Sequence, residues 1–518
     1  MIRLGIDVGG TNTDGVLLNE KNEVICSTKT PTTKNVFSGI QSTIEELLVS
    51  SNVNVKDIKI ATLGTTHCTN AIVERKSLNR IGIIRICLPS GTTVPPLVDW
   101  PEDLVQKLQA KTALIHGGYE FNGSPITGIV EDELLEIVES FRDTVDSIAI
   151  TGVFSPVLSE EEIEVAAYLQ QELPHIPVSL SSEIGTIGLI ERENATILNA
   201  ALKNVIKHVA EGFEQALATK DIQANIYFGQ NDGTLMTNVF AQKYPIFTIA
   251  CGPTNSIRGA SFLSKEPNAI VVDIGGTTTD IGVLTNGYPR QTSLAVEVGG
   301  VRTNYRMPDI YSLGLGGGTQ VTLEDGAWKI GPESVGYQLP EKAIIFGGDI
   351  LTVTDVAVGE GKMKMENSQD ENLASIPTQE IYPHIVEMVE KAIDRMKTSG
   401  DDVPVVLVGG GAALMPTTLR GASRIIRPEH AEVANAIGAA LGDISGTCEK
   451  IYLLANREHQ DVIEEAKQEA IQAAITAGAD PEQIDIIQLE DFPLAYIPGE
   501  AILVRVKVAG PLLLNGES

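Results

Sequence analysis

Residues 7–14 read DVGGTNTD, and residues 273–280 read DIGGTTTD. Six of the eight letters are identical in the two copies, which lie 266 positions apart. Each copy follows one short apolar run and precedes another, so each predicts a β-hairpin whose glycines accept positive φ angles at no steric cost. The chain therefore contains two halves that open on the same hairpin.

The duplicated hairpin suits a phosphate group. A Gly-Gly-Thr turn gathers backbone N–H groups and hydroxyls at one exposed tip, and these favour an anion. An aspartate ends each apolar strand, and Asp7 and Asp273 could hold Mg²⁺ through water. A single copy is explained by a tight turn with local hydrogen bonds. Two copies that both retain the aspartate predict two hairpins that bind a triphosphate from both sides of a groove.

A third glycine loop follows a buried strand, in VLVGGGAALMP at residues 406–416. Its glycines leave the backbone open to a purine and its ribose, and the small-residue helix ANAIGAAL follows at 434–441. The order of hairpin, hairpin, glycine loop and helix resembles the ATPase fold shared by sugar kinases, actin and the heat-shock chaperones. The chain has no GxxxxGK[ST] stretch, so a P-loop nucleotide site is not supported.

The resemblance implies an α/β fold with two ribonuclease-H-like (actin-like ATPase) domains around an ATP cleft. Strands and helices alternate along the chain, as expected for α/β layers. We place the first domain, with the first hairpin, at 1–184. The second domain, with the second hairpin and the adenosine loop, is placed at 185–445, and a small C-terminal α/β appendage at 446–518.

Composition restricts the class of protein. The 518 residues are 43% hydrophobic, and no apolar stretch is long enough to predict a membrane helix. The formal net charge of −30 repels nucleic acids. The five cysteines are scattered and form no CxxC pair, which favours a reducing, cytoplasmic location. We therefore expect a cytoplasmic protein that binds neither nucleic acid nor membrane.

Further stretches resemble the hydantoinase/oxoprolinase A family. They are LGTTHCTNAIVER at 63–75, SSEIGTIGLIERENATILNAAL at 181–202, LGLGGGT at 313–319, IGPESVG at 330–336 and TVTD at 352–355. The resemblance covers roughly residues 1–445, in order. It implies an ATP-dependent hydrolase that activates the carbonyl of a cyclic amide, such as a hydantoin, 5-oxoproline or a lactam, for ring opening. It also implies Mg²⁺ and a B-type subunit, and a homo-oligomer is possible.

The candidate site residues follow from the hairpins, the glycine loops and the family motifs. Asp7 and Asp273 are the catalytic candidates, and they are also metal candidates together with Asp309. The substrate candidates are Thr65, Thr66 and Asn70, at the expected start of a helix. The nucleotide candidates are Gly9, Gly10, Thr11, Thr13, Gly275, Gly276, Thr277, Thr278, Gly316, Gly317, Gly409, Gly410 and Gly411.

The chain departs from the family pattern outside the two hairpins. The family usually has a histidine at two positions where this chain has another residue. These are Leu63, and Tyr311 in the DIYS stretch at 309–312. The family's SGPAGG reads CGPTNS at 251–256. Two other functions of the same fold therefore stay open. One is a small-molecule kinase that stops at a phosphorylated product, and the other is an ATP-driven switch that acts on a partner.

Overall fold

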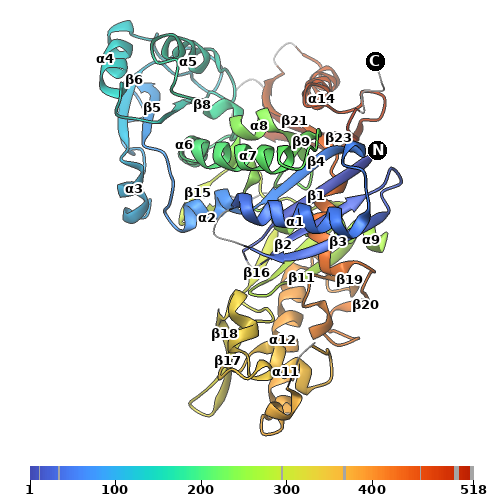
Figure 1. Cartoon of the computed structure of the whole chain (residues 1–518). Coiled ribbons are helices and arrows are strands. Elements are labelled where there is room, and N and C mark those ends of the chain that lie inside the picture. Colours follow the sequence, from blue (N-terminus) through green and yellow to red (C-terminus); the bar gives the residue numbers. More distant parts are fainter. Residues whose placement is uncertain are drawn as a thin grey trace.

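The computed structural model describes residues 1–10, 12–32, 36–292, 296–365, 369–454, 457–494 and 501–513. Figure 1 shows three lobes, with the sheet of β1 and β4 at the centre. The lobe of β5–β8 lies to one side of it, and the lobe of α11 and α12 lies below it. Both predicted hairpins are present, in the centre and in the lower lobe respectively.

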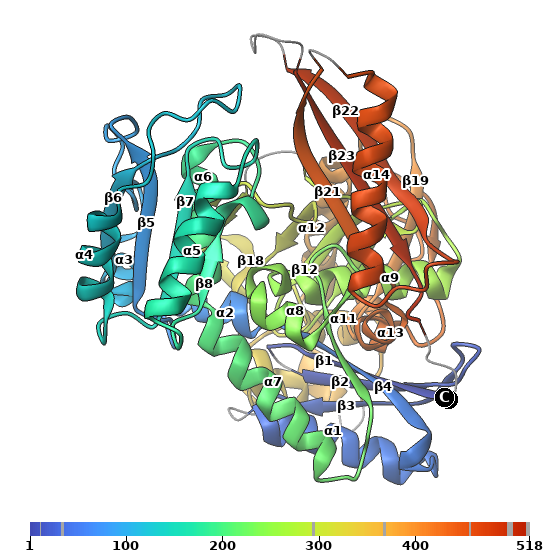
Figure 2. The same ribbon diagram turned by 90° about the horizontal axis from the view of Figure 1, so that it is seen from above.

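The central lobe is built on a nine-stranded sheet. In spatial order its strands are β22 (Asp485–Leu494), β23 (Ala501–Gly510), β21 (Ile444–Leu453), β10 (Leu235–Thr237), β9 (Asn225–Gly229), β4 (Ile58–Thr65), β1 (Ile2–Val8), β2 (Asn12–Leu18) and β3 (Val24–Pro31). Helices α1 (Val36–Ser51) and α7 (Lys203–Ala218) pack together beside β2 and β3, and α14 (His459–Thr476) packs on β21 and β23. Figure 2 shows α14 lying along these C-terminal strands.

A second sheet carries the second hairpin. Its strands run in the order β13 (Tyr288–Pro289), β12 (Thr279–Thr285), β11 (Ala269–Ile274), β19 (Val403–Val408) and β20 (Ala422–Ile426), and β16 (Ile310–Leu313) also pairs with β12. Helix α12 (Thr378–Met396) covers one face, and α9 (Cys251–Ser264) covers the other. Helix α11 (Val353–Gly359) packs on α12, and β17 (Thr319–Glu324) pairs with β18 (Ala327–Ser334) nearby.

The third lobe contains a four-stranded parallel sheet. Its strands are β6 (Lys111–His116), β5 (Ile81–Leu88), β7 (Ser147–Gly152) and β8 (Val178–Leu180), with helices α3 (Glu102–Leu108), α4 (Glu131–Phe141), α5 (Glu160–Glu172) and α6 (Leu189–Ala201). A fully buried ion pair of 2.6 Å joins Arg85 on β5 to Glu193 on α6. Shorter elements complete the chain: α2 (His67–Val73), α8 (Asn238–Lys243), α10 (Leu339–Lys342), β14 (Val296–Val298) and β15 (Val301–Thr303).

Two helices lie between the central and the second sheet and bring them together. Helix α9 crosses α13 (Ala434–Leu441) at backbone contact. A Cβ atom on Gly259 would lie 1.9 Å from the Ala434 carbonyl oxygen, and one on Gly438 would lie 1.9 Å from the Asn255 carbonyl oxygen. Both positions therefore require glycine, and the crossing fixes how the two hairpins face each other.

The predicted α/β class is confirmed. In each of the two large sheets an antiparallel hairpin is followed by two parallel strands, β4 and β9 beside β1, and β19 and β20 beside β11. The three domain boundaries stay predictions. The C-terminal strands β21 and β23 continue the central sheet, next to β10. No helix among the described residues is long and apolar enough to cross a membrane.

Candidate functional site

The two hairpins have the same geometry. Asp7 lies opposite Asp14 in the first, and Asp273 lies opposite Asp280 in the second. The turn closes with a hydrogen bond from the Gly9 N–H to the Asn12 carbonyl at 3.0 Å, and with its counterpart from Gly275 to Thr278 at 2.9 Å. The sequence repeat is therefore a structural repeat down to single hydrogen bonds.

The conformational role that we expected for the hairpin glycines is wrong. None of Gly9, Gly10, Gly275 and Gly276 adopts the left-handed conformation. A Cβ atom on Gly9 or Gly275 would instead lie 3.1 or 3.2 Å from the carbonyl oxygen that closes its own turn. Glycine suits the first position of each turn because a Cβ atom would crowd the closing carbonyl oxygen, and not because φ is positive.

Both hairpins and the third glycine loop line one cleft of about 660 Å³. The predicted residues in its lining are Gly9, Gly10, Asp273, Gly275, Gly276, Thr277, Thr278, Gly317, Gly409, Gly410 and Gly411. These residues come from segments more than 400 positions apart in the sequence. The structure thus brings together the three parts that the sequence singled out.

The cleft presents unused backbone donors. The N–H groups of Gly10, Gly276, Thr277 and Gly410 have no acceptor among the residues that the structure describes. A Cβ atom on Gly10 or Gly410 would meet nothing within 4 Å, so both backbones face open space. Free N–H groups at glycine turns are the arrangement that binds phosphate oxygens.

A glycine on the neighbouring parallel strand makes room for each hairpin aspartate. A Cβ atom on Gly64, at the end of β4, would lie 2.0 Å from Asp7 Oδ1. One on Gly409, just after β19, would lie 2.2 Å from Asp273 Oδ1. Each glycine therefore makes room for one hairpin aspartate, although Gly64 pairs with Asp7 whereas Asp273 pairs with Val408, one residue before Gly409.

The carboxylate of Asp7 is buried and held by two amides. Asn255 donates to Asp7 Oδ1 at 3.0 Å, and Asn435 donates to Asp7 Oδ2 at 3.0 Å. Asn435 also donates to Asp14 Oδ2 at 2.6 Å, and Asp14 forms an ion pair with Lys29 at 2.8 Å. Burial raises the pKa of Asp7 to about 6, and the Asn255 hydrogen bond partly opposes this rise.

Asp273 differs from Asp7 because it lines the cleft. Burial raises its pKa, while a hydrogen bond from the Ser256 side chain and the Lys29 charge lower it. Ser256 follows Asn255 on α9, so one helix contacts the aspartates of both hairpins. The charges of Asp14 and Asp273 both raise the pKa of Asp7, which shows that the three carboxylates lie near one another.

The rest of the lining is chemically mixed. Lys29 is the one basic side chain in the lining that the structure describes, against Asp14, Asp273 and Glu432. The lining also holds a set of apolar and aromatic side chains: Tyr337, Leu339, Met363, Met365 and Leu414. A lining with free N–H groups, charged side chains and apolar side chains suits a ligand that has both phosphate groups and a planar ring.

Several predicted residues lie behind or outside the lining. Asp7 lies behind it, Thr13 is buried with its hydroxyl 3.2 Å from Thr32 Oγ1, and Gly316 packs on the second hairpin. Asp309 pairs with Arg290 at 2.6 Å and does not reach the cleft. Thr11 lies outside the described residues. The roles assigned to all of these residues stay predictions.

The predicted substrate residues lie beside the first hairpin but do not line the cleft. The Thr66 hydroxyl contacts the Val8 carbonyl at 3.4 Å, and the Asn70 amide donates to Thr66 Oγ1 at 3.3 Å. Thr65 contacts Cys251 at the start of α9, where its carbonyl accepts from Sγ at 3.2 Å. These residues therefore lie next to Asp7, at the carboxyl end of β4.

Sequence reasoning missed several polar residues of the site, among them Asp14, Lys29, Asn255, Ser256 and Asn435. One signal for Asp14 was available, because it closes the repeated motif as Asp280 does in the second copy. Asn255 and Ser256 were visible only as departures from the family's SGPAGG stretch. Lys29 and Asn435 carry no motif, and only the fold brings them to the hairpins.

The chain matches models of one protein family. A model of the hydantoinase/oxoprolinase N-terminal region matches residues 3–173, and a hydantoinase/oxoprolinase model matches residues 192–375. The caprolactamase α subunit of Pseudomonas jessenii is 26% identical over 391 residues, which cover 69% of this chain and 54% of that protein. The 5-oxoprolinase 1 of Arabidopsis thaliana is 25% identical, with 59% of this chain and 26% of that protein covered. The matches thus span about half or less of these two relatives.

Solved structures show the fold. The ATP-dependent caprolactamase from Pseudomonas jessenii superimposes with a TM-score of 0.77 at 19% identity, over 100% of this chain and 89% of that one. Nucleotide-free acetone carboxylase superimposes with a TM-score of 0.69 at 18% identity, over 99% of this chain and 88% of that one. The arrangement of lobes described above is therefore shared with both structures.

Proposed function

Since the chain belongs to the hydantoinase/oxoprolinase family, we propose that it binds ATP in the hairpin cleft and uses it to activate a cyclic amide for ring opening. The observation that carries the proposal is the set of free N–H groups on both hairpins and on the third glycine loop, all in one cleft. The family relatives named caprolactamase and 5-oxoprolinase support the class of substrate.

The polar and the apolar residues of the cleft match the two parts of ATP. The hairpins bind the phosphates through the N–H groups of Gly10 and Gly276. Because glycine has no side chain, a phosphate can approach the backbone closely at both turns. The ring and ribose lie toward Gly410 and the apolar side chains, with Tyr337 offering an aromatic face. This orientation agrees with the adenosine role predicted for the third loop.

Mg²⁺ fits the same cleft. A triphosphate is strongly anionic, and Lys29 alone does not compensate it beside Asp14 and Asp273. Mg²⁺ usually binds one or two carboxylates, phosphate oxygens and several waters. Asp14 would hold it from the lining, with Asp7 behind Asp14, and the ion would neutralise charge on the transferred phosphoryl group.

The residues supply positioning and proton transfer. An amide carbonyl is a poor electrophile, and transfer of a phosphoryl group to its oxygen makes its carbon open to attack by water. Asp273 is placed to accept a proton from that water, because it lines the cleft and burial raises its pKa. Thr65, Thr66 and Asn70 would orient the carbonyl next to the first hairpin.

The test measures ATP binding and turnover separately. We expect the chain to bind ATP with Mg²⁺, and a lactam or hydantoin to stimulate ADP release. Asp273→Asn should abolish stimulated turnover while ATP affinity changes little, and Asp491→Asn, on the exposed strand β22, should have no effect. Absence of ATP binding would overturn the proposal. Accumulation of a stable phosphorylated product would instead identify a kinase.

A second subunit is part of the proposal. Related proteins are named as subunits, namely caprolactamase α, acetone carboxylase β and acetophenone carboxylase γ. We infer that ring opening by this chain needs a B-type partner, whereas ATP binding does not. We also propose a cytoplasmic location, because all five cysteines are free and a reducing compartment keeps thiols free.

A further inference from the structure

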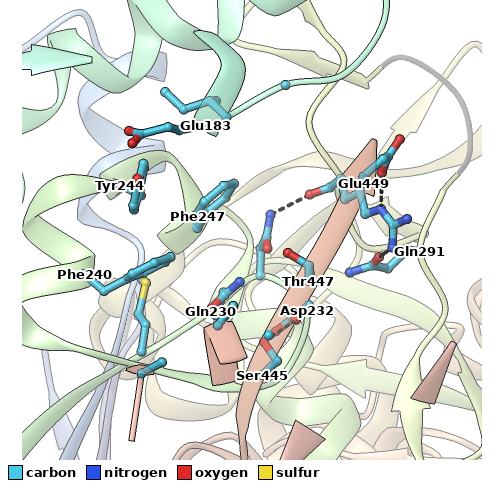
Figure 3. Close-up of a pocket in the computed structure, with 18 of the residues that line it drawn as sticks. Glu183, Gln230, Asp232, Phe240, Tyr244, Phe247, Gln291, Ser445, Thr447 and Glu449 are labelled. Carbon is cyan, nitrogen blue, oxygen red and sulfur yellow. Dashed lines mark hydrogen bonds and ion pairs between the residues drawn. The ribbon is translucent and has the colours of Figure 1, made fainter. Parts of the chain in front are cut away.

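A second cavity of about 350 Å³ lies beside the phosphate cleft and shares no lining residue with it. Figure 3 shows aromatic rings on one side of this cavity and polar side chains on the other. Its lining comes from the ends of β9 and β10, from α8, from β21 and from the loop that precedes α6. We call it the aromatic pocket.

The aromatic pocket lies at the same sheet edge as the phosphate cleft. Strands β1, β4 and β9 run parallel, so their carboxyl ends meet at one edge. Gln230 directly follows β9 at this edge and lines the pocket. Asp7, the second-last residue of β1, lies at the same edge. Phe247, which lines the pocket, is followed by Ala250 with a left-handed φ of 66° and then by the start of α9 at Cys251, whose Ser256 lines the phosphate cleft.

One side of the pocket is an aromatic wall. The ring centroids of Phe240 and Tyr244 lie 4.6 Å apart, and those of Tyr244 and Phe247 lie 5.7 Å apart. Phe247 stacks on Phe240 with an interplanar angle of 18°. Such a wall binds a flat or compact ring through dispersion and hydrophobic contact.

The charged side chains of the pocket are already compensated. Asp232 pairs with the buried Lys507 at 2.8 Å, and Glu183 pairs with Lys243 at 2.9 Å. Arg306 pairs with Glu449 at 3.0 Å. A charged ligand would have to break one of these pairs or remain unpaired in a partly buried site, and both are costly. The pocket therefore selects a neutral ligand.

Polar groups without partners face the aromatic wall. The Gln230 side-chain amide and the Thr447 hydroxyl have no hydrogen-bond partner among the described residues, and both line the cavity. A carboxamide offers one acceptor and two donors, which match the N–H and C=O of a cyclic amide. Figure 3 shows Gln230 and Thr447 across the cavity from Phe247 and Tyr244.

We infer that the aromatic pocket binds the ring of a neutral cyclic amide, and that it disfavours rings that carry a carboxylate. This inference rests on the proposed function, and it names both the substrate class and where the ring is recognised. It separates unsubstituted lactams from 5-oxoproline, whose carboxylate finds no unpaired cation here. Gln230 hydrogen-bonds the N–H of the amide, whose carbonyl is left to Thr65, Thr66 and Asn70, and Phe247 packs on the ring.

The test measures binding of δ-valerolactam and 5-oxoproline by calorimetry, with and without a non-hydrolysable ATP analogue. We expect the lactam to bind at least tenfold more tightly than 5-oxoproline. Gln230→Leu and Phe247→Ala should each weaken lactam binding at least tenfold and leave the affinity for the ATP analogue unchanged. Phe121→Ala, in a loop of the β5–β8 lobe, is the matched control and should change neither affinity.

The outcomes separate this inference from the proposed function. Normal binding of the ATP analogue, together with lactam binding that is absent or unaffected by both variants, overturns the inference alone. Tighter binding of 5-oxoproline than of the lactam also overturns it. Loss of binding of the ATP analogue to the unmodified chain overturns the proposed function. Melting curves of both variants exclude unfolding, and Gln230 is only partly buried, so its substitution is the safer of the two.

Discussion

Asn255 and Ser256 are neighbours on α9, and each contacts the aspartate of a different hairpin. Asn255 donates to Asp7 in the central sheet, and the Ser256 side chain hydrogen-bonds Asp273 in the second sheet. The family pattern has glycine at both positions, and glycine has no side chain that could make these contacts. In this chain, a single helix therefore sets the positions of both carboxylates.

Removal of the Ser256 hydroxyl should slow turnover. A hydrogen bond to a charged group contributes about 1.5–3 kcal/mol, which corresponds to roughly a ten- to hundredfold effect. We expect Ser256→Ala to lower ATP turnover within that range and to leave the Kd for ATP nearly unchanged. Because the lost hydrogen bond lowers the pKa of Asp273, the acid limb of the pH profile should also move to higher pH. If the acid limb of the pH profile does not shift, Ser256 contributes packing and not a hydrogen bond to Asp273.

Substitution of Gly64 should displace Asp7. A new Cβ atom there would overlap Asp7 Oδ1 at 2.0 Å and Asn255 Nδ2 at 2.4 Å. We expect Gly64→Ala to lower the melting temperature and to abolish ATP turnover. Gly10→Ala is the matched control for folding, because its Cβ atom would meet nothing within 4 Å. It should fold normally yet weaken ATP binding, since the methyl group enters the phosphate end of the cleft. Equal melting temperatures for the two variants would contradict this account.

The stability of the chain should depend on pH through Asp280. Burial raises the pKa of Asp280 to about 6, from 3.8 in the unfolded chain. The folded state therefore binds the proton of the Asp280 carboxyl group more tightly than the unfolded chain does. The stability that this proton contributes is lost as pH rises from about 4 to 6. Asp280→Asn removes the dependence, so the variant should gain stability over the parent across that window. The gain is at most about 3 kcal/mol, and residual solvent contact reduces it.

Thermal melts of both proteins at pH 4, 5, 6 and 7, without nucleotide, check the Asp280 prediction. The difference between the two melting temperatures should grow up to about pH 6 and then stay constant. A difference that shrinks as pH rises would mean that Asp280 is stabilised in its charged form.

The crossing of α9 and α13 should not tolerate a methyl group. Gly259→Ala would place Cβ 1.9 Å from the Ala434 carbonyl oxygen. Overpacking of this kind typically costs about 1–3 kcal/mol, which exceeds the gain of about 1 kcal/mol from alanine in a helix. Gly212→Ala on α7 is the control, because its Cβ atom would lie 3.9 Å from the nearest atom. Urea unfolding should show that Gly259→Ala is destabilised and that Gly212→Ala is stabilised.

The sequence predicted those parts of the site that repeat or carry glycine. The hairpins at Asp7 and Asp273 were visible because the motif occurs twice, and the loop at Gly409 because three glycines follow an apolar strand. The conformation of the turn glycines was not predicted correctly. A close carbonyl oxygen and a positive φ select the same residue, and the sequence does not distinguish them.

The partners of the carboxylates could not be read from the sequence. Asn435 donates to Asp7 across 428 positions, and Asn255 does so across 248. Both contacts depend on the helix crossing, which no local pattern encodes. The placement of β21 beside β10 is a further case, because strand order depends on long-range pairing rather than on the sequence of either strand.

The segment from Phe247 to Ser256 joins the two candidate ligand sites within ten residues of continuous chain. Ser256, on α9, lines the phosphate cleft, and Phe247, in the short turn that precedes α9, lines the aromatic pocket. The left-handed Ala250 separates the turn from the helix, so the two sites are built on distinct elements that meet at one residue. The two sites are therefore neighbours along the chain as well as at the sheet edge.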